Sequence, residues 1–386
     1  MVKTLKVGFL CPYSGIYPNY AQHIMGGMLL GMGLDPSAQQ QVLFIPAYTN
    51  MGDINSTMEA AKKLIFFERV DIISGLISFH ALPELKVLLE GKPVLSFFFN
   101  LGENLHYPEV SSKEIFINSQ MIWQSEFALG KWAQKEFGGT GVCITHFYES
   151  GYHLFASFKK GIEAAGGKEI GLSVIPRHPD NIAYMDFSAV FEAIRTEQPS
   201  FVHAIFCGKA ANDFLKAWFE QDFSRHIPLT GIENMAYEDV LEDVSALNCR
   251  FYAANSWSSD AELPENVAFV KLFERQMGQK ANIFAMMGYE TGMAIQQIKP
   301  YLDKGDLASA RNFLDNSKIY GPRAERGFNP SHHQRSTIDI RVVQIAENHI
   351  HQTIVAQETS ADQNSSHFHD ITNDILTGWQ NPYMCI

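Results

Sequence analysis

Polar, aromatic and glycine residues gather directly behind the predicted β-strands. These strand-end segments are Cys11–Tyr17, Gly75–His80, Phe97–Gly102, Phe147–Tyr152, Phe206–Lys209 and Thr230–Asn234. Such a mixture suits a small ligand with an apolar body and one or two polar groups. Ser78, at a predicted helix start, is a candidate for holding a carboxylate, and Glu233 for holding an ammonium. The other candidate ligand-binding residues in or near these segments are Tyr17, Phe79, Phe99, Asn100, Tyr148, Tyr152, Cys207 and Trp257.

Each of these candidates has a structural alternative. Ser78 can serve as a helix N-cap alone, and Glu233 can be a solvated loop carboxylate. Phe99 can be the buried end of a strand, and Cys207 a small buried hydrophobic residue.

The chain contains none of the common nucleotide-binding or hydrolase motifs. Gly26 and Gly31 have the spacing of a phosphate-binding loop, but Met32 stands where that loop requires Lys. Short histidine clusters occur at 332–333, 349–351 and 367–369, and none has a carboxylate array beside it. We therefore expect no catalysis, no cofactor and no bound metal.

Apolar runs of strand length alternate with longer amphipathic segments. The expected strands are 5–10, 42–48, 71–75, 93–98, 115–118, 141–147, 172–176, 201–206, 227–230, 250–254 and 336–346. The expected helices are 19–34, 53–69, 81–90, 121–137, 150–165, 185–197, 211–221, 265–277, 283–301 and 307–315. This alternation is typical of doubly wound α/β folds, with parallel sheets covered by helices on both faces. The pattern restarts at Met121, which indicates two α/β lobes.

Three local features carry further expectations. Asp53 is placed to N-cap the helix that follows it. The glycines of the first helix, Gly26, Gly27, Gly31 and Gly33, predict close packing on a sheet. The polar segment 358–368 predicts a loop.

Length and charge exclude several classes of protein. The 386 residues exceed the usual size of one domain. The net charge is −12 and no run of Lys or Arg occurs, which argues against nucleic acid or an anionic membrane surface as a partner. The five cysteines form no C-x-x-C pair, and no apolar stretch reaches the roughly 20 residues that span a bilayer. The N-terminal residues show no signal-peptide pattern, so export cannot be inferred from them.

Three segments occur in a familiar order: KVGFLCPYSG at 6–15, GIEAAGG at 161–167, and IYGPR with GFNP at 319–330. In these segments, and over residues 7–345, the chain resembles type I periplasmic solute-binding proteins of the branched-chain amino acid transport family. The resemblance implies two lobes joined by three crossovers, near 118–120, 255–258 and 330–335, with the ligand held between the lobes. It also implies delivery of the ligand to an ABC-type permease, without chemistry on the ligand.

The resemblance also implies roles for individual residues. Ser78 and Phe79 match the family's Ser-Ser segment, which meets the ligand carboxylate. Phe99 and Asn100 match its Ala-Thr pair, and Glu233 matches the acid that binds the α-ammonium. The walls of the pocket correspond to Tyr148 or Tyr152 and to Phe284.

The chain departs from the family pattern at two places. Phe79 and Phe99 are bulkier than their counterparts, which puts a typical leucine pose in doubt. Residues 324–326 are inserted where the family runs directly from Arg to Gly.

Several functions therefore stand in order. The first is a periplasmic or otherwise extracytoplasmic binding protein, monomeric, that delivers an amino acid-like ligand to an ABC transporter. An aromatic or aliphatic carboxylate is the alternative ligand. A ligand-sensing regulator on the same fold is the next alternative, and an enzyme the last. We expect one lobe over 1–119 with 257–332 and the other over 120–256 with 333–386.

Overall fold

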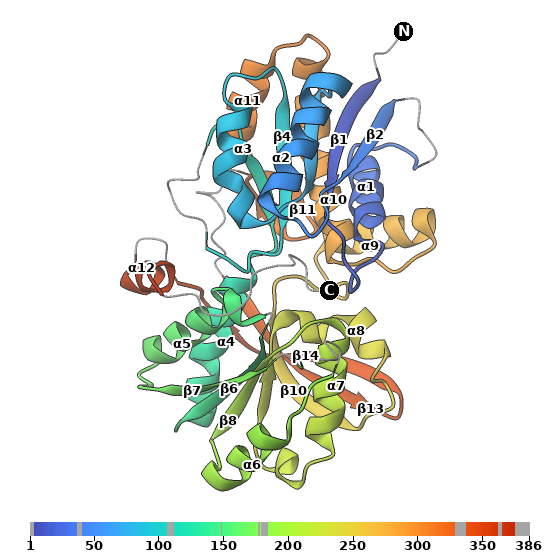
Figure 1. Ribbon diagram of the computed structural model, residues 1–386. Coiled ribbons are helices and arrows are strands. Elements are labelled where there is room, and N and C mark those ends of the chain that lie inside the picture. The colour runs from blue at the N-terminus through green and yellow to red at the C-terminus, as the bar shows by residue number, and fades with distance from the viewer. Residues whose placement is uncertain are drawn as a thin grey trace.

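The computed structural model describes residues 4–36, 41–105, 112–147, 149–176, 178, 184–328, 337–361 and 365–374. Two lobes lie one above the other in Figure 1, each built around its own sheet. The predicted α/β fold with two lobes is confirmed.

The sheet of the first lobe has, among the described residues, five parallel strands in the order β2-β1-β3-β4-β5. The strands are β1 (Leu5–Cys11), β2 (Val42–Tyr48), β3 (Ile72–Leu76), β4 (Leu95–Asn100) and β5 (Phe116–Ser119). β3, β4 and β5 are buried along their whole length, as expected for parallel strands covered on both faces. The covering elements are α1 (Tyr20–Gly31), α2 (Ile54–Lys62), α3 (Leu82–Leu89), α9 (Pro264–Met277), α10 (Ile283–Leu302), α11 (Leu307–Asn316) and the hairpin β11 (Ile319–Gly321) with β12 (Ala324–Arg326).

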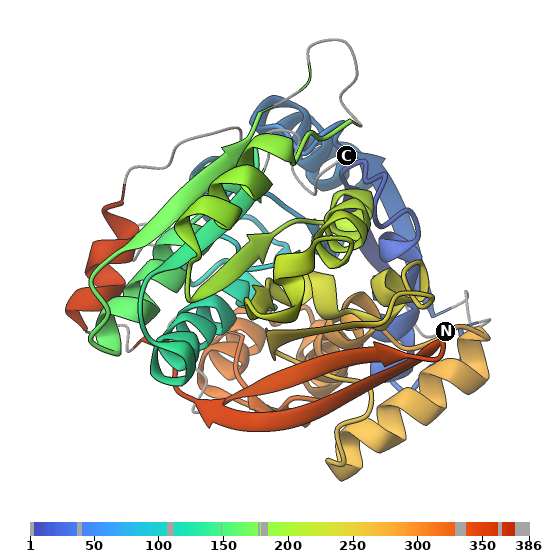
Figure 2. The ribbon, with the colours of Figure 1, turned by 90° about the horizontal axis from the view of Figure 1, so that it is seen from below.

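The sheet of the second lobe has, within the described ranges, seven strands in the order β14-β13-β10-β9-β8-β6-β7. The strands are β6 (Gly141–His146), β7 (Ile170–Ile175), β8 (Phe201–Ile205), β9 (Leu229–Gly231), β10 (Cys249–Asn255), β13 (Ile338–Ala346) and β14 (His349–Glu358). The helices are α4 (Ile122–Phe137), α5 (Leu154–Ala164), α6 (Ser188–Glu197), α7 (Gly208–Phe219), α8 (Glu238–Glu242) and α12 (Ser366–Thr372). In Figure 2, β13 and β14 lie in red-orange along one border of this lobe.

The two border strands correct the expectation of purely parallel sheets. β13 pairs antiparallel with both β10 and β14. β13 and β14 are joined by Glu347 and Asn348, whose φ angles are 52° and 63°. Two consecutive positive φ values are typical of a type I′ turn, which forces the strands it joins to run antiparallel. The sequence analysis predicted β13 and did not predict β14.

The glycines of α1 pack against a helix, not against a sheet. A Cβ on Gly27 would lie 2.2 Å from the carbonyl oxygen of Ala285, and one on Gly31 would lie 2.0 Å from that of Tyr289. Gly288 and Gly292 of α10 approach the backbone of α1 in the same way. The predicted close packing is present, but its partner was wrong, because α10 lies some 260 residues further along the chain.

The polar segment near the C-terminus contains a helix where a loop was expected. Ser365 caps α12 by accepting a hydrogen bond from the amide of Phe368 at 3.2 Å. Phe368 packs its ring on Trp123, with the centroids 5.6 Å apart, and Ile371 is fully buried. These two apolar side chains, spaced three residues apart, anchor an otherwise polar helix. The predicted N-cap of α2 is confirmed: Asp53 accepts from the amide of Ser56 at 2.9 Å.

Candidate ligand-binding site

A cavity of about 610 Å³ lies between the two lobes, beyond the carboxyl ends of β1, β9 and β10. Tyr17, after β1, and Phe284, at the start of α10, line it from the first lobe. Tyr237, after β9, lines it from the second lobe, and Trp257 lines it from the crossover that follows β10. The volume and the aromatic walls are those of a small-molecule site.

The aromatic walls are held in place by one another and by hydrogen bonds. The rings of Tyr17 and Phe284 meet edge to face, with centroids 5.1 Å apart. Tyr20 packs on the other side of Phe284 at 5.8 Å. The hydroxyl of Tyr20 donates to the carbonyl of Pro12 at 2.7 Å, which ties α1 to the loop after β1. The cavity is therefore preformed rather than assembled by mobile side chains.

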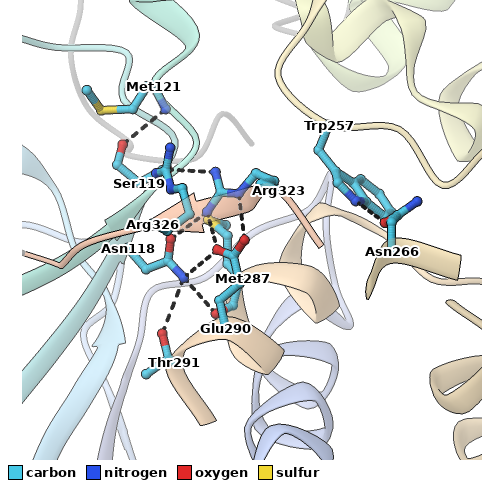
Figure 3. A network of polar contacts seen from close by, with 10 residues as sticks. All are labelled: Asn118, Ser119, Met121, Trp257, Asn266, Met287, Glu290, Thr291, Arg323 and Arg326. Carbon is cyan, nitrogen blue, oxygen red and sulfur yellow. Dashed lines mark hydrogen bonds and ion pairs between the residues drawn. The ribbon is translucent and has the colours of Figure 1, made fainter. Parts of the chain in front are cut away.

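Asn266 fixes the crossover that carries Trp257 (Figure 3). Its Oδ1 accepts from the indole Nε1 of Trp257 at 2.7 Å. Its Nδ2 lies within hydrogen-bond distance of the carbonyl oxygens of Ser258, Ser259 and Ala261, at 3.0–3.2 Å. One buried amide thus orients both the indole ring and the segment beside it.

Glu233 is fully buried at the junction of the lobes. Its Oε2 accepts from the hydroxyl of Ser125 in α4 at 2.8 Å, and its Oε1 accepts from the amide of Ser256 at 2.6 Å. Ser125 lies in the first helix after the β5–α4 crossover, and Ser256 lies in the second crossover. Glu233 therefore links two crossovers, a role that its loop position did not predict.

Tyr237 is a site residue that the sequence analysis missed. Its side chain is buried, and within the described part of the chain its hydroxyl has no hydrogen-bond partner. Burial raises its pKa well above the usual value, and the nearby Glu233, Tyr17, Asp239 and Cys207 raise it further. The hydroxyl is thus neutral and available to a ligand. The search behind each strand ended at Asn234, three residues before Tyr237.

The predicted residues divide into two groups. Tyr17, Trp257 and Phe284 line the cavity, and Cys207 and Glu233 lie near Tyr237. The others are buried among the described residues and do not line this cavity: Ser78, Phe79, Phe99, Asn100 and Tyr152. Tyr148 lies outside the described residues.

Buried neighbours account for several members of the second group. The side chain of Ser78 accepts from the amide of His80 at 3.4 Å, as a helix cap. Phe99 packs on Phe9 inside the first lobe, with ring centroids 6.4 Å apart. Phe79 packs in the other apolar cluster of that lobe.

A family model described as a periplasmic binding protein matches residues 4–349. The chain belongs to the periplasmic binding protein family. The match covers most of the chain and supports, at the level of the family, the resemblance seen in its sequence segments.

Solved structures of such binding proteins have the same fold. An ABC transporter substrate-binding protein from Sphaerobacter thermophilus superposes with a TM-score of 0.78 at 20% identity, covering 93% of this chain and 99% of that one. An ABC transporter solute-binding protein from Rhodopseudomonas palustris BisB5, in complex with 3,4-dihydroxybenzoic acid, gives 0.73 at 19%, covering 94% and 99%. An amino acid ABC transporter substrate-binding protein from Pseudomonas fluorescens Pf-5 gives 0.75 at 14%, covering 94% and 97%. A comparison with curated proteins found no match.

Two further properties concern only the described residues of this periplasmic binding protein. None of their helices is long and apolar enough to cross a membrane. No group of three or more His, Cys, Asp or Glu side chains within these ranges is arranged to hold a metal ion.

Arg323 of the IYGPR segment clamps the first crossover of this periplasmic binding protein (Figure 3). Its Nη1 donates to the carbonyl of Ser119 at 2.9 Å, and its Nη2 donates to Oδ1 of Asn118 at 2.6 Å. Its Nε donates to Oε1 of Glu290 in α10 at 3.1 Å. Asn118 in turn donates to the carbonyl of Met287 at 2.9 Å. The segment that resembles the family therefore holds the end of β5 against α10, at the point where the chain leaves the first lobe.

The lobes approach closely at Gly208, the first residue of α7. Its φ is +52°, and a Cβ there would lie 2.7 Å from Cγ1 and 2.9 Å from Cγ2 of Ile16 in the first lobe. We expect Gly208→Ala to push the lobes apart, because both branches of Ile16 block the new methyl group. Small-angle X-ray scattering of the ligand-free protein should give a larger radius of gyration than wild type.

Gly166, after α5, is the matched control for this substitution. Its φ is +89°, and nothing lies within 4 Å of a Cβ placed there. Gly166→Ala has the same kind of backbone strain without the interlobe clash, and it should leave the radius unchanged. Equal radii for the two variants would contradict the expected clash.

Proposed function

We propose that this chain is the extracytoplasmic solute-binding component of an ABC transporter, which captures a small molecule between its lobes and delivers it to the membrane permease. The observation that carries the proposal is the aromatic-lined cavity between the lobes of a periplasmic binding protein. A ligand that touches both lobes favours the closed arrangement, since its contacts are complete only there. Binding and release need no bond-making step, so we propose no enzymatic activity.

We propose an amino acid-like ligand first. Tyr17 and Phe284 would enclose an apolar side chain, and Tyr237 would donate its hydroxyl to a polar head group. Glu233 is the candidate acceptor for an ammonium, because a buried cation needs a charged acceptor in place of water. The structural neighbour from Pseudomonas fluorescens, named as an amino acid transporter component, supports this assignment.

An aromatic carboxylate is the second candidate. The neighbour from Rhodopseudomonas palustris holds 3,4-dihydroxybenzoic acid, and the rings around the cavity suit a flat ligand equally well. Such a ligand has no ammonium, and Glu233 would then act only on the crossovers.

We also propose the lobe boundaries 1–119 with 257–332 and 120–256 with 333–386. The passage from β5 to α4 at 120–121 and the crossover after β10 support the first two of them. The third, at 330–335, lies outside the described residues.

A thermal-shift screen tests the proposed function. A ligand present at about 100 times its Kd adds roughly 2.7 kcal/mol to the free energy of unfolding. Leucine, phenylalanine, 4-hydroxybenzoate and 3,4-dihydroxybenzoate should include a compound that raises the melting temperature, while glycine, serine and glucose should not. Glucose giving the largest shift would overturn the proposed ligand classes.

A further inference from the structure

One ion-pair cluster joins the two lobes at the edge of the cavity. Lys280 lies in the short connection between α9 and α10, in the first lobe. Its Nζ contacts Oε1 of Glu242 at 2.7 Å and Oε1 of Glu238 at 3.1 Å, both in α8 of the second lobe. All three side chains are at least half exposed.

The two acids are placed to share one cation. Glu238 and Glu242 stand four residues apart in α8, so their carboxylates lie on the same face of the helix. Without a cation between them they repel each other. Hydrogen bonds to Glu242 and Glu238 raise the pKa of Lys280 to about 12, so its charge persists at neutral pH.

The connection that carries Lys280 is anchored to the first lobe. Asn282 caps α10 by accepting from the amide of Ala285 at 3.0 Å, which leaves its Nδ2 to donate to Nδ1 of His23 at 2.7 Å. The Nε2 of His23 then donates to Oε1 of Gln279 at 2.6 Å. Residues on both sides of Lys280 are thus fixed to α1 and α10, and its ammonium moves with that lobe.

We propose that Lys280 is an interlobe latch: it binds Glu238 and Glu242 only when the lobes are close together, and so stabilises the closed arrangement of the cavity. The inference rests on the proposed function for its consequence, which is slower release of the ligand. Exposed ion pairs are individually weak, so the latch adjusts the open-to-closed ratio instead of locking it. Salt weakens it, because ions screen exposed charges.

The test needs no ligand, which separates it from a failure of the proposed function. Dyes on Val87→Cys in α3 and Glu192→Cys in α6, in a Cys385→Ser background, report the interlobe distance by single-molecule energy transfer. The other four cysteines are buried and unreactive to dyes. We expect Lys280→Met to raise the open-to-closed ratio about three- to tenfold in low salt. Raising the salt to about 0.5 M should have a similar effect on the wild type and little on the variant.

Lys299→Met is the matched control, because Lys299 pairs with Asp303 at 2.7 Å within α10 and spans no lobe boundary. It should leave the ratio unchanged. Lys280→Glu should open the protein further, and adding Glu242→Lys should restore part of the closed population. A ratio that is the same in wild type and Lys280→Met overturns the latch, including the case of a ligand-free protein that is wholly open.

Discussion

Arg323→Met is expected to lower the free energy of unfolding by about 3–5 kcal/mol. The side chain of Arg323 is 3% exposed and that of Glu290 is 0% exposed, so the substitution leaves a buried carboxylate without its cation. It also removes the donors to Asn118 and Ser119 at the first crossover. Urea titration followed by circular dichroism measures the loss.

Lys318→Met in the same hairpin is the control. Lys318 pairs with Glu325, and both side chains are 40% exposed or more, so this change should cost less than about 1 kcal/mol. Adding Glu290→Met to Arg323→Met should recover part of the loss, because a buried pair replaced by apolar side chains leaves no unpaired charge. An equal loss for Arg323→Met and Lys318→Met would contradict the buried clamp.

The same pair predicts how stability depends on pH. Burial would raise the pKa of Glu290, but Arg323, Arg326 and Asn118 outweigh it and lower the pKa below the usual 4.5. A carboxyl group with a lowered pKa stabilises the fold above its unfolded pKa and loses this contribution as the pH falls through the folded value. The stability difference between wild type and Glu290→Gln should therefore be constant near neutral pH and shrink below about pH 4.5. Parallel curves down to pH 3 would exclude this linkage.

Glu233→Gln is expected to have the largest effect on ligand affinity. If the ligand is an amino acid, losing the charge opposite its ammonium costs about 2–5 kcal/mol, which is roughly 30- to several-thousandfold in Kd. If the ligand is a carboxylate without an ammonium, the change should be neutral or should tighten binding. Isothermal titration with phenylalanine and 4-hydroxybenzoate distinguishes the two ligand classes.

Ser125→Ala separates the ligand role of Glu233 from its role at the crossovers. Ser125 donates to Glu233 at 2.8 Å, so its removal weakens the link between α4 and the second crossover but keeps the carboxylate. Glutamine can still accept from the amide of Ser256 and donate to Ser125. If Ser125→Ala weakens phenylalanine binding as much as Glu233→Gln does, Glu233 acts through the crossovers and not on the ammonium.

The sequence by itself determined the two α/β lobes and most of their elements. Strand β2, at 42–48, has the predicted bounds, and helix α4 begins one residue from its predicted start. Asp53 caps α2 as expected. These features depend on neighbouring residues: the spacing of apolar side chains along a few turns and one side chain bonded to an amide three residues on.

The site could be predicted only in part. Tyr17, Trp257 and Phe284 were identified and line one cavity. The three phenylalanines 97–99 alternate between two clusters of the first lobe, with Phe98 in one and Phe97 and Phe99 in the other. A continuous apolar run carries no record of which face its residues occupy or which end meets a ligand, since both faces of a parallel sheet are buried.

Only the tertiary structure decided the contacts between distant segments. The glycine face of α1 meets α10, Arg323 reaches Ser119, and Lys280 reaches Glu242 across the lobes. Tyr237 becomes a site residue because the loop after β9 turns toward Tyr17 and Cys207. Local periodicity encodes which side of an element is apolar, but not which element covers it. That choice depends on the free energy of packing segments that lie up to about 260 residues apart in this chain.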